Sequence, residues 1–198
     1  EAGFDRERCV HELIAAQAQR TPDAPAVLFA GQTLSYRQLD QRANQLAHRL
    51  RERGVGPDVL VGLAAERSLA MVVGLLGVLK AGGAYVPLDP DYPADRLGYM
   101  IEDSGIRLML AQAHLELIDS RATPRLLVHD THHADTARAL QGADLQYTHH
   151  DSLIATASPR ALPLPSVNGD LPLLLVYTSG TTGVPKGAVH TQAALLAN

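Results

Sequence analysis

The sequence has a single cysteine, Cys9, no tryptophan and few other aromatic residues. One cysteine cannot form an internal disulfide, so the fold needs no oxidising compartment. No apolar run approaches the roughly 20 residues that span a bilayer, and the first residues lack the basic and apolar stretches of a signal peptide. Neither charge is in large excess, because 17 basic and 21 acidic side chains leave a net charge of −4. Such a chain attracts neither nucleic acid nor anionic membrane, and we expect it to be cytoplasmic.

The composition is that of a globular protein. Hydrophobic residues make up 46% and charged residues 19% of the 198 positions, which is enough apolar material for one large domain. The first residue is Glu1 rather than methionine, and we expect the sequence to be part of a longer chain. We divide it into four parts. Residues 1–8 are a linker, 9–111 an α/β region and 112–170 a variable α/β and loop region. Residues 171–198 hold a strand, a phosphate loop and the following segment.

The N-terminal third predicts two helices separated by a hairpin. Apolar residues recur at helical spacing between positions 10 and 18. A strand over 26–29 and a short returning strand around 33–34 follow. Ser35 and Gln38 then have the spacing of a capping box, which predicts the start of a long amphipathic helix.

The middle of the sequence alternates apolar strands with helices. Nearly unbroken apolar residues at 58–64 predict a strand buried on both faces, and the run over 68–81 predicts a buried helix. The further expected elements are a helix carrying Leu97, Met100 and Ile101, and strands at 84–88, 108–110, 126–128 and 173–177. This alternation with short links indicates an α/β fold with a mostly parallel sheet flanked by helices.

The strand at 173–177 runs directly into a loop rich in glycine, serine and threonine. Glycines let backbone amides approach an anion, hydroxyl groups add donors, and Lys186 adds a mobile positive charge. The spacing matches neither G-x-x-x-x-G-K-[ST] nor G-x-G-x-x-G. Residues 178–187 are therefore a candidate phosphate-binding loop, with a flexible polar connector as the alternative.

Three segments in order resemble one known family. Residues 174–187 read LLVYTSGTTGVPKG, which is similar to the phosphate loop of the AMP-forming adenylating enzymes. Residues 79–104 read LKAGGAYVPLDPDYPADRLGYMIEDS and resemble the second core motif of amino-acid adenylation domains in nonribosomal peptide synthetases. Residues 34–47 resemble their first core motif. The resemblance implies the N-terminal portion of such a domain, an incomplete part of the large subdomain of an adenylate-forming enzyme.

The resemblance also implies a reaction. A complete domain makes an aminoacyl-AMP from ATP and an amino acid, with Mg²⁺, and loads it on the phosphopantetheine thiol of a carrier protein domain beside other synthetase domains. Lys186 would accompany the leaving pyrophosphate as a catalytic residue. The residues that would bind the ATP phosphates with it are Thr178, Ser179, Gly180, Thr181, Thr182 and Gly183.

The sequence departs from the family pattern in two ways. The family commonly has Thr-His after the phosphate loop, whereas Thr191 is followed here by Gln192. The sequence also ends at Asn198, before the family's amino-acid pocket, adenine loop, ribose-binding aspartate and second lysine. We therefore expect this chain alone to be inactive. Two alternatives stay open: a non-catalytic structural or docking module within a megasynthase, and a fragment of an acyl-CoA ligase, which residues 79–104 resemble less.

Other chemical candidates have simpler explanations. Histidines at 129–133 and 149–150 match no standard metal-ligand spacing, so we expect a solvated loop and no metal site. Cys9 has no partner acid or base at a suitable spacing. The carboxylates between Asp89 and Asp103 fit turn and helix positions better than acid–base catalysis, and Arg96 is expected to hold that loop through charge-assisted bonds.

Overall fold

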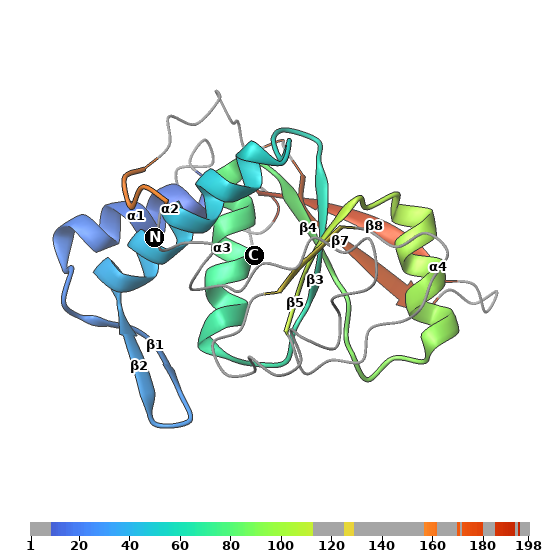
Figure 1. Ribbon diagram of the computed structural model, residues 1–198, viewed down its shortest axis with the longest axis horizontal. Coiled ribbons are helices and arrows are strands. Elements are labelled where there is room, and N and C mark those ends of the chain that lie inside the picture. Colours follow the sequence, from blue (N-terminus) through green and yellow to red (C-terminus); the bar gives the residue numbers. More distant parts are fainter. Residues whose placement is uncertain are drawn as a thin grey trace.

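The computed structural model describes residues 9–112, 125–128, 157–161, 170, 172–179, 185–192 and 194. The described helices and strands alternate for most of this length (Figure 1). They are α1 (Val10–Arg20), β1 (Pro25–Phe29), β2 (Gln32–Ser35), α2 (Tyr36–Glu52), β3 (Leu60–Ala64), α3 (Leu69–Ala81), β4 (Ala84–Pro87), α4 (Ala94–Ser104), β5 (Leu108–Ala111), β6 (Arg125–Val128), β7 (Pro172–Ser179) and β8 (Pro185–Thr191).

The described strands form one large sheet and a separate hairpin. The sheet has six strands in the order β6-β5-β3-β4-β7-β8, and β1 pairs with β2 apart from it. All neighbours in the sheet are parallel except β7 and β8, which are antiparallel. The predicted α/β class with a mostly parallel sheet is confirmed.

Two details differ from the expected elements. The strand expected from position 58 begins at Leu60, because Asp58 has φ 61° and interrupts the extended backbone. The sequence pattern did not predict β8, although its residues pair with β7 over its whole length.

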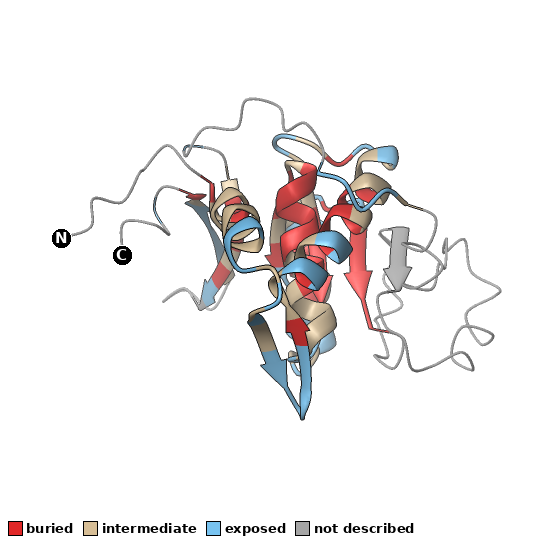
Figure 2. Cartoon of the chain, turned by 90° about the vertical axis from the view of Figure 1, so that its left-hand side faces the viewer, coloured by how far each residue is buried: buried red, intermediate tan, exposed pale blue. Residues whose placement is uncertain are grey.

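Helices cover both faces of the sheet. Val61, Leu63, Leu108 and Leu110 pack in one core with residues of α2 and α3. The alternate positions of the same strands pack in a second core with α4. Figure 2 shows α3 and the strands behind it mostly buried, whereas the β1–β2 hairpin is largely exposed. The central strands are therefore covered on both sides, as their apolar sequences predict.

Helices α2 and α3 approach closely because of a glycine. A Cβ at Gly77 would lie 2.6 Å from the Leu46 side chain, so only hydrogen fits between the helices. The capping box at the start of α2 is confirmed, since the Gln38 backbone N–H donates to Ser35 Oγ and the Ser35 N–H to Gln38 Oε1, at 3.3 and 3.0 Å. Gly82 ends α3 in the left-handed conformation with φ 93°.

A buried polar cluster joins α2 and α3, and a buried histidine of α1 lies near it. Lys80, only 6% exposed, donates from Nζ to Asp40 Oδ1 and Asn44 Oδ1, both at 2.7 Å. Burying an ammonium group costs free energy of desolvation, which is offset here because the group is paired and hydrogen-bonded. His11 of α1 lies 1% exposed nearby, and burial lowers its pKa to about 4.

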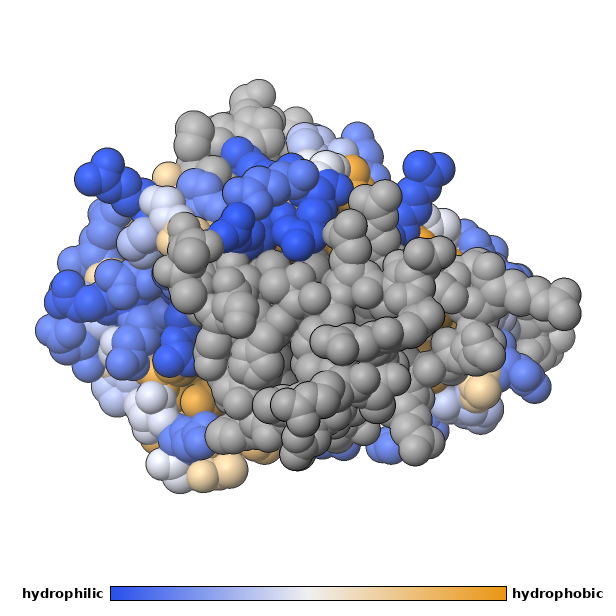
Figure 3. Space-filling model, in the orientation of Figure 1, coloured by the Kyte–Doolittle hydropathy of each residue, from blue (hydrophilic) through white to orange (hydrophobic). Residues whose placement is uncertain are grey.

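The polar side of α2 also holds a segment distant in sequence. Asn44 Nδ2 donates to the carbonyl of Pro159 at 2.9 Å, and His48 Nε2 lies 3.0 Å from the carbonyl of Arg160. Both partners are backbone oxygens, which only accept hydrogen bonds. In Figure 3, the described atoms over α1 and α2 are mostly hydrophilic. No helix among the described residues is both long and apolar enough to cross a membrane.

The buried His11 predicts a pH dependence of stability. Its ordinary pKa of 6.5 falls to about 4 in the folded chain, so between these values the unfolded chain binds the proton more strongly. The free energy of unfolding should therefore drop as pH falls from about 6.5 to 4, by on the order of 3 kcal/mol. Measured by urea unfolding, the free energy of unfolding should fall with pH in this way for the native chain and not for His11→Leu. His190→Leu, at an exposed position, should behave like the native chain, and equal slopes in all three would contradict the prediction.

Cys9 is predicted to be unreactive in the folded chain. It is 0% exposed, and burial together with Glu12 raises its pKa to about 11, whereas thiolate is the reactive form. Alkylation by iodoacetamide at pH 7.5, followed by mass spectrometry, should be more than about 100-fold slower in buffer than in urea, given the usual thiol pKa near 8.5. Equal labelling rates in the two conditions would refute the burial of this thiol.

Candidate functional site

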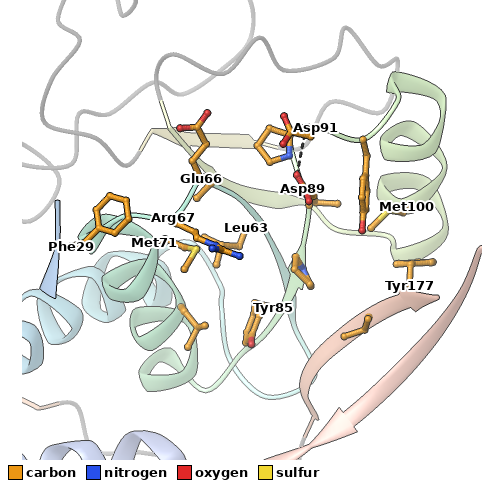
Figure 4. A pocket seen from close by; sticks show the side chains of 17 residues that line it. Phe29, Leu63, Glu66, Arg67, Met71, Tyr85, Asp89, Asp91, Met100 and Tyr177 are labelled. Atoms are coloured by element: carbon orange, nitrogen blue, oxygen red, sulfur yellow. Dashed lines mark hydrogen bonds between the residues drawn. The ribbon is translucent and has the colours of Figure 1, made fainter. Parts of the chain in front are cut away.

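The carboxyl ends of β3, β4 and β7 meet at one edge of the sheet. Ligands of open parallel sheets bind outside this edge. A pocket of about 750 Å³ lies there. Figure 4 shows its side chains coming from the loops after β3 and β4 and from the end of β7, together with Phe29 of β1, Met71 of α3 and Met100 of α4. Its charged lining residues are Glu66, Arg67, Asp89 and Asp91.

The loop after β3 is fixed by a buried glutamine. Gln112, 5% exposed, follows β5. Its Oε1 accepts a hydrogen bond from the Glu66 N–H at 2.7 Å, and its Nε2 donates to Ser68 Oγ at 3.0 Å. Ser68 Oγ also accepts from the Met71 N–H and so caps α3. This wall of the pocket therefore depends on Gln112. The residue was not predicted from the sequence, since a lone glutamine after a strand forms no recognisable pattern.

The loop after β4 is a turn built by its own residues. Asp89 Oδ1 accepts a hydrogen bond from the Asp91 N–H at 3.0 Å (Figure 4), an arrangement typical of aspartate in turns. The Arg96 guanidinium lies over the Tyr92 ring, 4.0 Å from its centroid. No charge-assisted bond of Arg96 is found among the described residues, so the expectation for this residue stays a prediction. The contact that is present is a cation–π contact, which fixes the loop.

The end of β7 is anchored on α4. Tyr177, 6% exposed, donates from its hydroxyl to Asp103 Oδ2 at 2.6 Å. The Tyr99 ring packs against the Tyr177 ring edge-on, with centroids 6.3 Å apart. Burial, together with the hydrogen bond to Asp103, raises the pKa of Tyr177. Tyr177 is therefore a neutral donor, and Asp103 acts as its structural acceptor.

Two of the predicted phosphate-binding residues lie opposite each other just beyond this anchor. Thr178 pairs with Lys186 across the antiparallel strands, and Ser179 pairs with Pro185. Thr178 Oγ1 donates to the Lys186 carbonyl at 3.5 Å, and both Thr178 and Lys186 are exposed. Gly180, Thr181, Thr182 and Gly183 lie outside the described residues. The structure thus makes Thr178 and Lys186 cross-strand partners at the carboxyl end of β7.

A small residue beside Lys186 lets β8 lie close to β7. A Cβ at Gly187 would lie 3.0 Å from Leu175 Cδ1 and 3.5 Å from the Tyr177 ring.

Among the described residues, no three histidine, cysteine or acidic side chains converge as metal ligands. The predicted solvated histidine loop lies outside the described part of the chain. Thr178 and Lys186 offer a hydroxyl group and a cation, which are suited to a phosphorylated ligand.

Several known proteins are similar to this chain. A family described as "AMP-binding enzyme" matches residues 14–198. Gramicidin S synthase 2 of Aneurinibacillus migulanus is 46% identical over 186 residues, which are 94% of this chain and 4% of that protein. Bacitracin synthase 3 of Bacillus licheniformis is 42% identical over 188 residues, 95% of this chain and 3% of that protein. The chain thus spans only a few hundredths of the length of these relatives.

Solved structures show the same similarity. The crystal structure of the nonribosomal peptide synthetase FmoA3 matches with a TM-score of 0.77 and 31% identity, over 96% of this chain and 18% of that one. The N-terminal subdomain of Klebsiella oxytoca NpsA shares the fold with a TM-score of 0.69 and 22% identity, over 94% of this chain and 43% of that one. The resemblance to nonribosomal peptide synthetases and the expected fold are confirmed. Since the family match covers most of the sequence, the chain belongs to the AMP-binding enzyme family.

Proposed function

We propose that this chain is the N-terminal part of an amino-acid adenylation domain of a nonribosomal peptide synthetase. The complete domain would convert ATP and an amino acid to an aminoacyl adenylate and pyrophosphate, and would pass the aminoacyl group to the phosphopantetheine thiol of a carrier protein domain. The observation that carries the proposal is the Thr178–Lys186 pair at the carboxyl edge of the sheet, in a chain of the AMP-binding family.

Adenylation requires that the leaving pyrophosphate be neutralised. The amino-acid carboxylate attacks the α-phosphorus of ATP, the bond to the bridging oxygen breaks, and negative charge grows on the β- and γ-phosphates. An ammonium group and hydroxyl donors that are already in position stabilise that charge. In our proposal Lys186 contacts the pyrophosphate, and Thr178 and Ser179 bind the phosphates together with Gly180, Thr181, Thr182 and Gly183.

The reaction would also need a metal ion and the two substrates. Mg²⁺ would neutralise charge on the phosphates of ATP. It is usually held by one or two carboxylates and by the phosphates themselves. The described residues contain no cluster of three ligands, and none of them is assigned to the ion. The FmoA3 structure has been determined with AMPPNP and with α-methyl-L-serine-AMP, which supports ATP and an amino acid as the substrates here.

The first experiment identifies the reaction. ATP–pyrophosphate exchange is measured with the full-length protein that carries this chain, once with a panel of amino acids and once with fatty and aryl carboxylic acids. We expect exchange with at least one amino acid. Exchange only with carboxylic acids, followed by transfer to coenzyme A, would favour an acyl-CoA ligase, and no exchange with either panel would favour a non-catalytic module.

Lys186 is predicted to act on the reaction and not on folding. Lys186→Ala should lower the exchange rate about 10- to 100-fold, because a charge-assisted hydrogen bond contributes about 1.5–3 kcal/mol. The side chain is exposed, so the free energy of unfolding should change by less than about 0.5 kcal/mol. The matched control is Arg107→Ala, which removes an exposed cation just before β5, at the opposite edge of the sheet. An equal loss in both variants, or a large drop in stability for Lys186→Ala alone, would contradict this role.

A further inference from the structure

Gln192 connects the end of β8 to the start of α1. It directly follows β8 and is 2% exposed. Its Oε1 accepts a hydrogen bond from the backbone N–H of Val10 at 3.0 Å, between residues 182 positions apart in sequence. The residue at which this sequence departs from the family pattern is therefore a buried structural contact.

The N-terminus of α1 needs such a partner. The first backbone N–H groups of a helix have no acceptor within the helix. The N–H of Cys9, the residue before α1, is bonded to Glu12 Oε2 at 2.9 Å, and the thiol of Cys9 is a weak acceptor. The side-chain oxygen of Gln192 supplies the acceptor for the next N–H, that of Val10. A distant residue thus acts as a cap for α1.

Strand β8 has few buried side chains that could fix its register. Its residues from Lys186 to His190 are exposed, and Val189 is 61% exposed. A strand whose apolar face is not buried is poorly protected against slippage along its partner. The pairing with β7 also contains an irregularity between Pro172 and Leu174, close to the end of β8 that Gln192 follows.

We propose that Gln192 is a positioning residue that holds β8 in the register at which Lys186 lies opposite Thr178. A slip by one residue would turn Lys186 to the other face of the sheet, and a slip by two would move it about 7 Å along β7. The contact of Gln192 with Val10 lies at the opposite end of β8 from Lys186. The consequence for pyrophosphate release rests on the proposed function, but the register itself does not.

Cross-linking tests the register without any activity. Cysteines at 178 and 186, introduced as Thr178→Cys and Lys186→Cys in the full-length protein, should form a disulfide under mild oxidation, because these residues are direct cross-strand partners. Adding Gln192→Met, which keeps the length of the side chain and removes the strong acceptor, should lower the yield at least threefold. Gln192→Glu keeps an acceptor oxygen beside the helix N-terminus and should restore it. Gln19→Met makes the same change at an exposed position of α1 and should have no effect.

A double-mutant cycle tests the consequence for the reaction. If Gln192 places Lys186, Lys186→Ala should lower the exchange rate much less in the Gln192→Met background than in the native protein, by less than about threefold against 10- to 100-fold. Circular dichroism and urea unfolding confirm that the variants are folded, and Gln192→Leu replaces Gln192→Met if that variant is not.

The outcomes separate the two proposals. Equal effects of Lys186→Ala in both backgrounds, or an unchanged cross-linking yield with Gln192→Met, would overturn the positioning role of Gln192. A protein with no exchange at all would contradict the proposed function, and cross-linking alone would then decide the register.

Discussion

The burial of β3 on both faces is the constraint on which the arrangement depends. Val61 and Leu63 face the core shared with α2 and α3, whereas Ala64 packs in the core beneath α4. Gly62 allows that second layer to come close, since a Cβ there would lie 2.7 Å from Ile106 Cδ1. A strand enclosed in this way needs parallel neighbours and helical crossovers. The crossovers then bring the carboxyl ends of β3, β4 and β7 to a single edge, where the loops form a pocket.

Strong local patterns made much of this fold predictable from the sequence. Helical periodicity, the Ser35–Gln38 spacing and apolar runs each depend on neighbouring residues alone, and the corresponding elements are present. Strand β8 was not predicted, because its residues are mostly exposed and show no apolar alternation. Its pairing partner is set by the chain reversing direction after β7, which is a tertiary effect.

The candidate site was predictable from its local composition and from the resemblance of residues 174–187 to a phosphate loop. Glycines, hydroxyls and a lysine after a buried strand indicate a phosphate ligand, and the pairing of Thr178 with Lys186 agrees with that interpretation. The side chains that hold the site in place could not be found in this way. Gln112, the Tyr177–Asp103 hydrogen bond and the contact of Gln192 with Val10 each join residues at least 44 positions apart. No local sequence pattern encodes such contacts.

The attachment of residues 157–161 to α2 has a consequence for sequence variation. Asn44 and His48 bind the backbone carbonyls of Pro159 and Arg160 and not their side chains. Every amino acid carries that carbonyl, so the attachment places little constraint on which residues occupy the segment. The constraint falls on α2 instead, where replacing Asn44 would also remove an acceptor from the buried Lys80. Homologous chains can therefore diverge freely along this stretch while its path over α2 is retained.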